Sequence, residues 1–267
     1  MSNADMHAHY GAGVELDRLL GGSSRIEFAR TKELLERFLP TPPARVLDVG
    51  GGPGRYATWL AGSGHAVHLV DPVPLHVEEA MAAARGLANP FTAATGDARH
   101  LDVPDDDFDV VLLLGPMYHL IEREERMAAL QEARRVVRPG GSVAVAAISR
   151  FASLLHGLIY GELGDPTFSG IVDRDLREGQ HRNPTENQAW FTTAFFHHPD
   201  ELRDEVTEAG LEVEGVFGVE GPGWLLSDQW DDPVGRETIL RVARAVEREQ
   251  TMIGVSGHLL AVARRVR

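Results

Sequence analysis

Apolar residues in the first 150 positions fall into two alternating patterns, short continuous runs and helical spacing. The continuous runs have strand length and are apolar enough for strands buried on both faces of a sheet. Between them, apolar residues recur at the spacing of a helix with one buried face. The patterns predict strands at 45–49, 66–70, 91–95, 108–114 and 142–149, and helices at 23–39, 55–61, 77–87 and 127–137.

Strands that alternate with helices in this way are typical of right-handed βαβ units. Such units build an open, mostly parallel sheet with helices on its faces, and ligands bind beyond the carboxyl ends of the strands. We therefore expect an α/β fold whose functional residues lie in the loops that follow the strands.

The pattern loosens after Arg150. Residues 151–163 keep helical spacing, whereas 164–198 are rich in proline, glycine, asparagine, histidine and aromatic residues and have no clear period. We interpret 151–198 as a cap inserted after the fifth strand. After residue 198, periodic patterns of apolar residues return and predict one more helix and two more strands. These two strands bring the sheet to seven, and a helical insert separates them. These segments are the helix 199–209, the strand 211–219, the insert at about 221–255 with a helix at 232–249, and the strand 258–265.

The composition narrows the possible functions. With 267 residues and 43% apolar content, the chain can bury one large core. Its net charge of -14 argues against nucleic acid as substrate, because a phosphate backbone would be repelled. The absence of cysteine excludes disulfides, thiolate metal sites and a cysteine nucleophile, and fits a reducing cytoplasm. No apolar run approaches the length of a membrane span and no signal peptide is evident, so we expect a cytoplasmic protein without a membrane partner.

The first predicted strand runs into a glycine-rich turn over 48–54. A dinucleotide-binding turn requires G-x-G-x-x-G/A. Counted from Gly50, its sixth position is Arg55, which does not fit; counted from Gly52 it is Ala57, which fits but leaves two extra glycines after the strand. The alternative pattern D-x-G-x-G-x-G is matched in full by Asp48, Gly50, Gly52 and Gly54.

Three other strand ends carry loops of similar interest. Asp71-Pro72 closes the second predicted strand, Gly96-Asp97-Ala98 the third, and the run from Leu114 to His119 the fourth. The carboxyl ends of parallel strands meet at one edge of a sheet, so these loops and the glycine turn are expected around one ligand. Each loop alone is weak evidence, but the four in strand order support one another.

In these four features the chain resembles the class I S-adenosylmethionine-dependent methyltransferases, from about Arg45 to Ser149. The resemblance implies a Rossmann-like, open, mostly parallel seven-stranded sheet and S-adenosylmethionine as cofactor. It implies that the glycine turn packs beside the methionine moiety and the nucleoside. It also implies that Asp48 reaches the ammonium, that Asp71 binds the ribose hydroxyls, and that the loop after strand four faces the methyl group. The implied cofactor-binding residues are Tyr10, Arg30, Asp48, Gly50, Gly51, Gly52, Gly54, Asp71, Pro72, Asp97, Ala98, Leu114, Gly115, Tyr118 and His119.

The resemblance also divides the chain into four segments. Residues 1–43 are expected to form a helical lid over the cofactor, in which Arg30 either pairs with the cofactor's carboxylate or is an exposed helix arginine. The segment 44–150 is the cofactor-binding core, 151–198 the substrate cap, and 199–267 the completion of the core.

Methyl transfer from a sulfonium is an in-line displacement, for which a protein supplies alignment, exclusion of water and sometimes a base. The loop after strand four lacks the Asp/Asn-Pro-Pro-aromatic run of amide and exocyclic-amine methyltransferases. Without cysteine, cytosine-carbon and arsenic methylation are also disfavoured, and Leu114 and Ser149 stand where the catechol type would place metal-binding carboxylates. We therefore expect an oxygen, nitrogen or carbon nucleophile on a small molecule, or a peptide terminus, and S-adenosylhomocysteine as product.

Histidines and aromatic residues gather in the predicted cap, which suits an aromatic or cationic acceptor. His119 and His197 are the candidate bases, although the histidines before Pro199 could instead pack or cap a helix. No metal site is predicted, because no histidine pair has helical i, i+4 spacing and no cysteine is present. The candidate acceptor-binding residues are Tyr118, Tyr160, His181, Arg182, Trp190, His197 and His198.

Two other functions remain open from the sequence. One is an NAD-dependent oxidoreductase on the same kind of sheet, although it gives no role to Asp97 or to the turn at 138–141. The other is a non-catalytic protein that binds S-adenosylmethionine.

Overall fold

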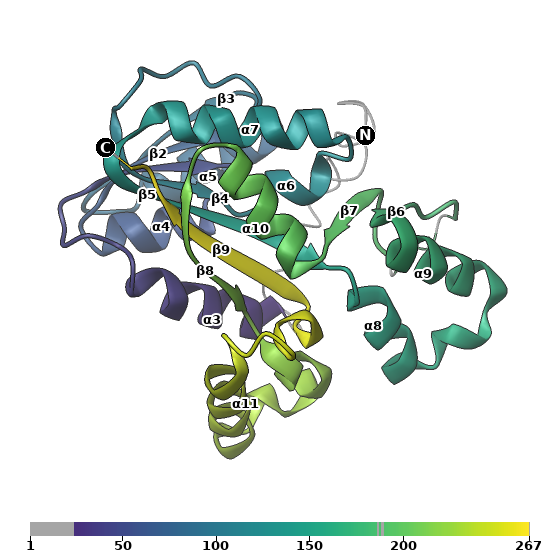
Figure 1. The fold of residues 1–267 in the computed structure, drawn as a ribbon. Coiled ribbons are helices and arrows are strands. Elements are labelled where there is room, and N and C mark those ends of the chain that lie inside the picture. Colours follow the sequence, from purple (N-terminus) through teal and green to yellow (C-terminus); the bar gives the residue numbers. More distant parts are fainter. Residues whose placement is uncertain (1–23, 186, 188–189, 267) are drawn as a thin grey trace.

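Parallel strands occupy the centre of one sheet, in the order β3-β2-β1-β4-β5, and β7 and β6 extend it beyond β5 (Figure 1). The computed structural model describes residues 24–185, 187 and 190–266. β9 pairs antiparallel with β5, and β8 pairs antiparallel with β9. The strands are β1 (Arg45–Val49), β2 (Ala66–Asp71), β3 (Thr92–Thr95), β4 (Phe108–Leu113), β5 (Val137–Ser149), β6 (Gln180–His181), β7 (Ala194–His197), β8 (Glu212–Gly218) and β9 (His258–Arg264).

The predicted fold class is confirmed. The seven expected strands correspond to β1 to β5, β8 and β9, and the short β6 and β7 add a ribbon beside the end of β5. The helices are α3 (Ser24–Glu36), α4 (Arg55–Gly62), α5 (Pro74–Ala84), α6 (Pro116–His119), α7 (Arg123–Val136), α8 (Ala152–Tyr160), α9 (Pro166–Glu178), α10 (Pro199–Glu208) and α11 (Pro233–Val246). Short 3-10 helices are η1 (Glu162–Gly164), η3 (Gly221–Asp231) and η4 (Ile253–Val255). In the described residues, no helix is long and apolar enough to cross a membrane.

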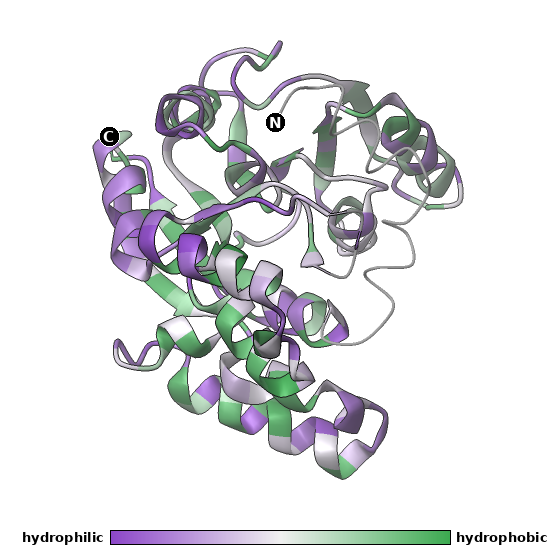
Figure 2. Cartoon of the chain, turned by 90° about the vertical axis from the view of Figure 1, so that its right-hand side faces the viewer, coloured by the Kyte–Doolittle hydropathy of each residue, from purple (hydrophilic) through white to green (hydrophobic). Residues whose placement is uncertain are grey.

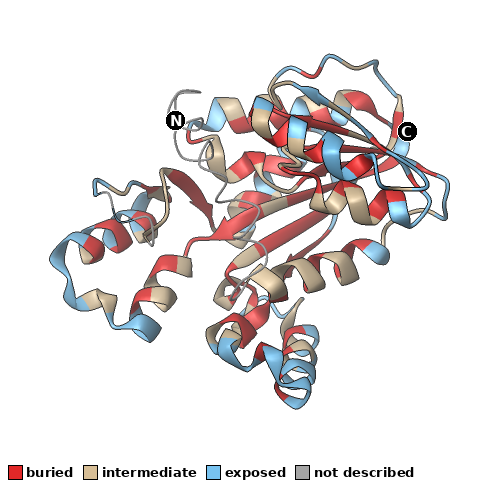
Figure 3. Ribbon diagram, turned by 180° about the vertical axis from the view of Figure 1, so that it is seen from behind, coloured by how far each residue is buried: buried red, intermediate tan, exposed pale blue. Residues whose placement is uncertain are grey.

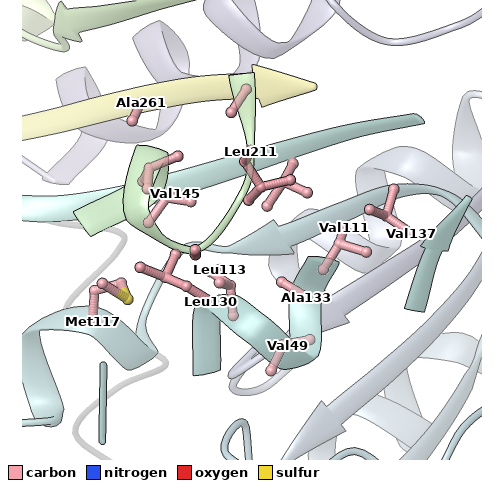
Figure 4. Close-up of a cluster of buried hydrophobic side chains, with 14 of the residues drawn as sticks. Val49, Val111, Leu113, Met117, Leu130, Ala133, Val137, Val145, Leu211 and Ala261 are labelled. Carbon is pink, nitrogen blue, oxygen red and sulfur yellow. The ribbon is translucent and has the colours of Figure 1, made fainter. Parts of the chain in front are cut away.

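Alternate residues of the central strands pack on opposite faces of the sheet. In β4, Val111 and Leu113 face a cluster with α7 and α10, whereas Val110 and Leu112 face a cluster with α3, α4 and α5. Figure 4 shows the first cluster, with Leu130 from α7 against the strand side chains. Both faces are thus covered, which explains the continuous apolar runs. Apolar residues accordingly lie along the strands and on helix faces (Figure 2), and the strands β1, β4 and β9 are buried along most of their length (Figure 3).

Proline marks the start of several helices. It stands at the first position of α5, α6, α9, α10 and α11, where its missing N–H costs no hydrogen bond and its fixed φ suits the helix. Asp165 caps α9 by accepting from the backbone N–H groups of Thr167 and Phe168, and Asp232 caps α11 by accepting from Gly235.

One segment differs from the sequence prediction. The stretch 164–198, in which the sequence shows no clear period, contains the 13-residue helix α9 and the ribbon of β6 and β7. Phe168, Ile171 and Val172 have helical spacing and are buried, but the next position of that face is Asp175, which is also buried. The polar residue interrupts the apolar pattern and concealed the helix.

A buried ion pair between Arg126 and Glu205 joins α7 to α10. The Arg126 guanidinium donates to the Glu205 carboxylate at 2.7 Å and to the backbone oxygen of Ile121. His197 Nε2, at the end of β7, lies 3.2 Å from the same carboxylate. Burial disfavours the charged form of Glu205, but hydrogen bonds from His197 and Arg126 outweigh it and lower its pKa to about 2.

Replacing Glu205 by alanine should therefore destabilise the fold by about 3–5 kcal/mol, because Arg126 would be left charged, buried and without its partner. Glu208 on the same helix pairs with Arg123 at the surface and serves as the control. Its replacement by alanine should cost less than about 1 kcal/mol. Urea unfolding followed by circular dichroism measures both; equal losses would contradict the assigned role of Glu205.

Candidate cofactor and acceptor cavities

A cavity of about 870 Å³ opens at the carboxyl ends of β1, β2 and β4, the edge at which the sequence predicts a ligand. Residues from all four predicted loops line it. They are Val49, Gly50, Gly52, Val70, Asp71, Pro72, Val73, His76, Gly96, Asp97, Ala98, Arg99, Gly115, Pro116, Tyr118, His119 and Leu120.

The glycine turn forms the floor of this first cavity. Gly50 has φ +70°, and a Cβ there would lie 2.8 Å from Cδ of Pro116, so a side chain would both strain the backbone and collide with the loop after β4. The Gly50 N–H donates to the Val70 carbonyl at 2.7 Å, which ties the turn to the end of β2. The turn thus presents bare backbone to the cavity, as a closely approaching ligand requires.

Asp71 is held rigidly at the end of β2. Its carboxylate accepts from the backbone N–H groups of Gly52 and Val73, at 2.8 and 2.9 Å, and lies 3.0 Å from His76 Nδ1. Each carboxylate oxygen can accept more than one hydrogen bond, so these contacts leave capacity for a ligand's hydroxyl groups. His76, which lies in the first turn of α5 and five residues after Asp71, was not among the residues predicted from the sequence.

Asp97 is held differently. Arg99 donates to it from its backbone N–H and its guanidinium, with the closest contact at 2.5 Å, and this hydrogen bonding lowers the pKa of Asp97. Arg99 also pairs with Glu125. Asp97 is therefore a charged acceptor at the cavity wall, and Arg99 is a lining residue that the sequence analysis missed.

Asp48 lies beneath the glycine turn rather than in the cavity wall. It is completely buried, and neither carboxylate oxygen has a hydrogen-bond partner among the described residues. Burial, together with the nearby charge of Asp71, raises the pKa of Asp48 to about 7. An unpaired buried carboxyl group is costly, so this position fits a nearby cationic group of a ligand, such as the ammonium of S-adenosylmethionine.

A second cavity, of about 950 Å³, lies between the core, the cap and the C-terminal insert. Tyr118 lines both cavities, so they meet at the loop after β4. Aromatic rings dominate the second cavity, and no lysine or arginine is among its described lining residues. They are Ser24, Tyr118, Ile148, Ala152, Ser153, His156, Phe168, His181, Trp190, Phe191, Phe196, Glu220, Trp224, Gly257 and His258.

Three of the predicted acceptor-binding residues line this second cavity: Tyr118, His181 and Trp190. His181 is held at both ring nitrogens, with Nδ1 2.8 Å from Asp175 and Nε2 2.7 Å from the Trp190 carbonyl. Glu220 and His258 also line the second cavity but were not predicted from the sequence. Both are distant from the cap in sequence: Glu220 follows β8 and His258 begins β9.

Four predicted acceptor-binding residues lie elsewhere. Tyr160 is 61% exposed beside His156, and Arg182 is exposed and donates to the Gln180 side chain. His198 is the N-cap residue of α10, with its ring against Phe151. The predictions for these three residues are therefore not supported by their positions. The fourth residue is His197.

His197 is also misplaced for its predicted role as a base. Its ring is completely buried, lines neither cavity and is bound to Glu205, and burial lowers its pKa. The position of His197 matches the other possibility given by the sequence, that this histidine packs in the interior. His119, the other candidate base, lines the first cavity and stacks edge-on against Tyr118.

Arg30 is neither exposed nor in the cavity. Its guanidinium is completely buried, pairs with Glu33 and Glu247 at 2.7 and 2.6 Å, and donates to the Val219 carbonyl. It ties α3 to the C-terminal insert, which corrects the prediction that it binds the cofactor. Gly51, Gly54 and Leu114 are not among the residues that line the first cavity, and Tyr10 lies outside the described residues.

The comparisons with known proteins agree with this arrangement. A family model described as "Methyltransferase domain" matches residues 46–141. Methyltransferase GfsG of Streptomyces halstedii is 33% identical over 148 residues, 53% of this chain and 51% of that protein. The chain thus spans about half the length of this relative.

Two further similarities extend over more of the chain. The tRNA 5-carboxymethoxyuridine methyltransferase of Escherichia coli is 25% identical over 230 residues, 83% of this chain and 80% of that protein. The crystal structure of an S-adenosylmethionine-dependent methyltransferase from Methanosarcina mazei covers 87% of this chain and 97% of its own, with a TM-score of 0.60 and 17% identity. At this low sequence identity, the structural similarity shows only that the two proteins share a fold.

Replacing Asp71 by asparagine should weaken binding of S-adenosylhomocysteine at least ~10-fold, about 1.4 kcal/mol, because charge-assisted hydrogen bonds to hydroxyl groups would be lost. Asp102 is an exposed acid just beyond β3 that lines neither cavity, so Asp102→Asn is the matched control and should leave the affinity unchanged. Isothermal calorimetry measures both, and an unchanged Kd for Asp71→Asn would remove Asp71 from the site.

Asp48 predicts a pH effect. Its pKa is raised to about 7 in the folded protein. The protonated carboxyl group therefore favours the unliganded folded state over the unfolded state at low pH, and this contribution to stability is lost as pH rises through about 7. A bound ammonium would favour the carboxylate and expel the proton. Calorimetry at about pH 6.5 in buffers of different ionisation enthalpy should therefore detect proton release on ligand binding, and Asp48→Asn should abolish it. Equal proton release in both proteins would contradict this role.

Proposed function

We propose that this chain is a class I S-adenosylmethionine-dependent methyltransferase that uses S-adenosylmethionine as its methyl donor. We further propose that it methylates a nucleophile on a small aromatic molecule. In this proposal the first cavity holds the donor and the second cavity holds the acceptor. The cap at 151–198 and the insert at 221–255 supply most of the acceptor's surroundings.

One observation carries the proposal: the two cavities meet at Tyr118. In-line displacement requires the acceptor on the far side of the methyl group from sulfur, in contact with it and shielded from water. Two adjoining cavities with different chemistry satisfy that need. The first has carboxylates and bare glycine backbone, and the second is lined largely by aromatic rings.

The residues of the first cavity fit the donor. Gly50 leaves space for a closely packed ligand, Asp71 offers a fixed carboxylate for vicinal hydroxyls, and the buried Asp48 offers a counter-charge for an ammonium. When bound, S-adenosylmethionine supplies an electrophilic methyl group on a cationic sulfur. The loop from Gly115 to Tyr118 would orient that end toward the second cavity, and His119 would contact the donor.

The aromatic lining of the second cavity favours a flat, uncharged acceptor. Phe168, Trp190, Phe196 and Trp224 provide large apolar faces, and Trp224 is fixed by a hydrogen bond from Nε1 to the Val255 carbonyl at 2.9 Å. No lysine or arginine among the described lining residues would neutralise a phosphate or carboxylate group on the acceptor.

A tRNA acceptor is the second candidate, because the Escherichia coli tRNA 5-carboxymethoxyuridine methyltransferase resembles this chain over most of its length. The net charge of -14 opposes it, since binding to a phosphate backbone depends on clustered lysine and arginine. The small aromatic acceptor is therefore the stronger proposal, and transfer RNA belongs in the same assay as a comparison.

The test is release of S-adenosylhomocysteine from S-adenosylmethionine over a panel of hydroxyarenes, aromatic amines and transfer RNA. We expect turnover with members of the aromatic panel and none with the RNA. Trp190→Ala should raise KM for the aromatic acceptor at least ~10-fold, with unchanged Kd for S-adenosylhomocysteine, because Trp190 lines only the second cavity. Turnover with RNA alone would overturn the proposed acceptor class. Tight binding of NADH without binding of S-adenosylhomocysteine would support an oxidoreductase instead.

A further inference from the structure

The cap helix α8 presents different residues on its two sides. One side lines the second cavity through Ala152, Ser153 and His156. On the opposite side, apolar residues recur at the i, i+3, i+4 spacing that brings side chains onto one helix face. These residues, called the α8 stripe below, are Leu154, Leu155, Leu158 and Ile159. The helix thus has a second apolar face that the acceptor cavity does not use.

The α8 stripe is open to solvent. Leu158 is 65% exposed and Ile159 is 49% exposed, and Leu154 and Leu155 are half-buried. In Figure 1, α8 stands apart from the central sheet, on the part of the molecule that lies beyond the end of β5. Large apolar side chains exposed next to one another commonly mark a contact surface. We therefore expect another surface to cover the stripe.

A groove of about 1490 Å³ adjoins the stripe, between α8, the start of α10 and η4. Leu154 and Leu155 of the stripe line it, and Phe151, Ile253 and Val255 add further apolar side chains. Its volume exceeds the roughly 300–1,000 Å³ of a typical small-molecule pocket. A segment of protein is therefore a better match to the groove than a small ligand.

Charge limits what can cover this surface. The start of α10 places the exposed acids Asp200 and Asp204 at the groove, with Arg203 between them in sequence. Acids at the rim oppose an anionic lipid surface, and α8 has no lysine or arginine to attract one.

The net charge of the chain bears on self-association in the same way. At a net charge of -14, two copies repel one another, so contact is favoured where charged side chains are absent. α8 carries no aspartate, glutamate, lysine or arginine, although these four residue types make up 25% of the chain. The α8 stripe is therefore a surface at which two copies can meet without bringing like charges together.

We propose that two copies of this chain form a twofold-symmetric dimer in which the α8 stripe of each copy enters the groove of the other. An apolar helix face and an apolar groove lie side by side on one patch, so a twofold rotation brings both pairs into contact at once. Helix faces with this spacing pack against one another by interdigitating their side chains. The dimer holds α8 from the side opposite to the second cavity. A different partner would have to supply both a helix face and a groove.

Sedimentation velocity of the full chain, over a dilution series from about 0.1 to 100 µM, tests the proposal. The wild-type chain should form a species of twice the mass of one chain. Leu158→Glu should raise the dissociation constant of the dimer at least ~100-fold, because a carboxylate would be buried in an apolar contact. Its far-ultraviolet circular dichroism should match that of the wild type, since Leu158 is exposed in the single chain.

Val234→Glu is the matched control. Val234 is an apolar residue of α11 that is 74% exposed and lies outside both the stripe and the groove. The same substitution there should leave the dissociation constant unchanged.

Three results would overturn the proposal. They are a wild-type chain that stays at the mass of one chain up to ~100 µM, a dimer that Leu158→Glu leaves intact, and a single chain that binds phosphatidylglycerol vesicles through Leu158. The last result would assign the stripe to a lipid surface. Because sedimentation is measured without donor or acceptor, its outcome is independent of the proposed function.

Discussion

Burial of the central strands on both faces is the constraint on which the rest of the structure depends. Hydrogen bonds along each strand are satisfied by its neighbours, and helices cover the side chains above and below. Only the strand ends remain available to a ligand, and in a parallel sheet the carboxyl ends meet at one edge. Gly50, Asp71, Asp97 and Tyr118 therefore gather around one cavity, although they span much of the core sequence.

The two insertions extend this edge in opposite ways. The cap leaves the sheet after β5 and returns through β7, whereas the C-terminal insert leaves after β8 and returns through β9 (Figure 1). Because β9 runs antiparallel to β5, its first residue lies at the same end of the sheet as the last residues of β5. The second cavity is consequently enclosed in part by segments from both insertions, whereas the first cavity is lined by the strand ends and loops of the core.

Local patterns sufficed for the fold and for much of the first cavity, because strand runs and the loops after them are contiguous in sequence. They did not suffice for Arg30, whose partner Glu247 is more than 200 positions away. The same limit applies to His197 and His258. His197 is the last residue of β7 and His258 is the first residue of β9. The pairing of β9 with β5 places His258 at the second cavity, whereas the packing of α10 buries His197.

The buried charged residues of this chain differ in how many hydrogen-bond or ion-pair partners they have. Arg126 and Glu205 satisfy one another in the interior and make no contact with either cavity, which is the behaviour of a structural pair. Asp48 is equally buried and neither of its carboxylate oxygens has a described hydrogen-bond partner, which fits its proposed role beside a cationic group of a ligand. Glu220 lies between these cases, because its oxygens accept from Ser256 and His258 and yet it lines the second cavity. An interior acid thus points to function where it still has an interaction to make with a ligand.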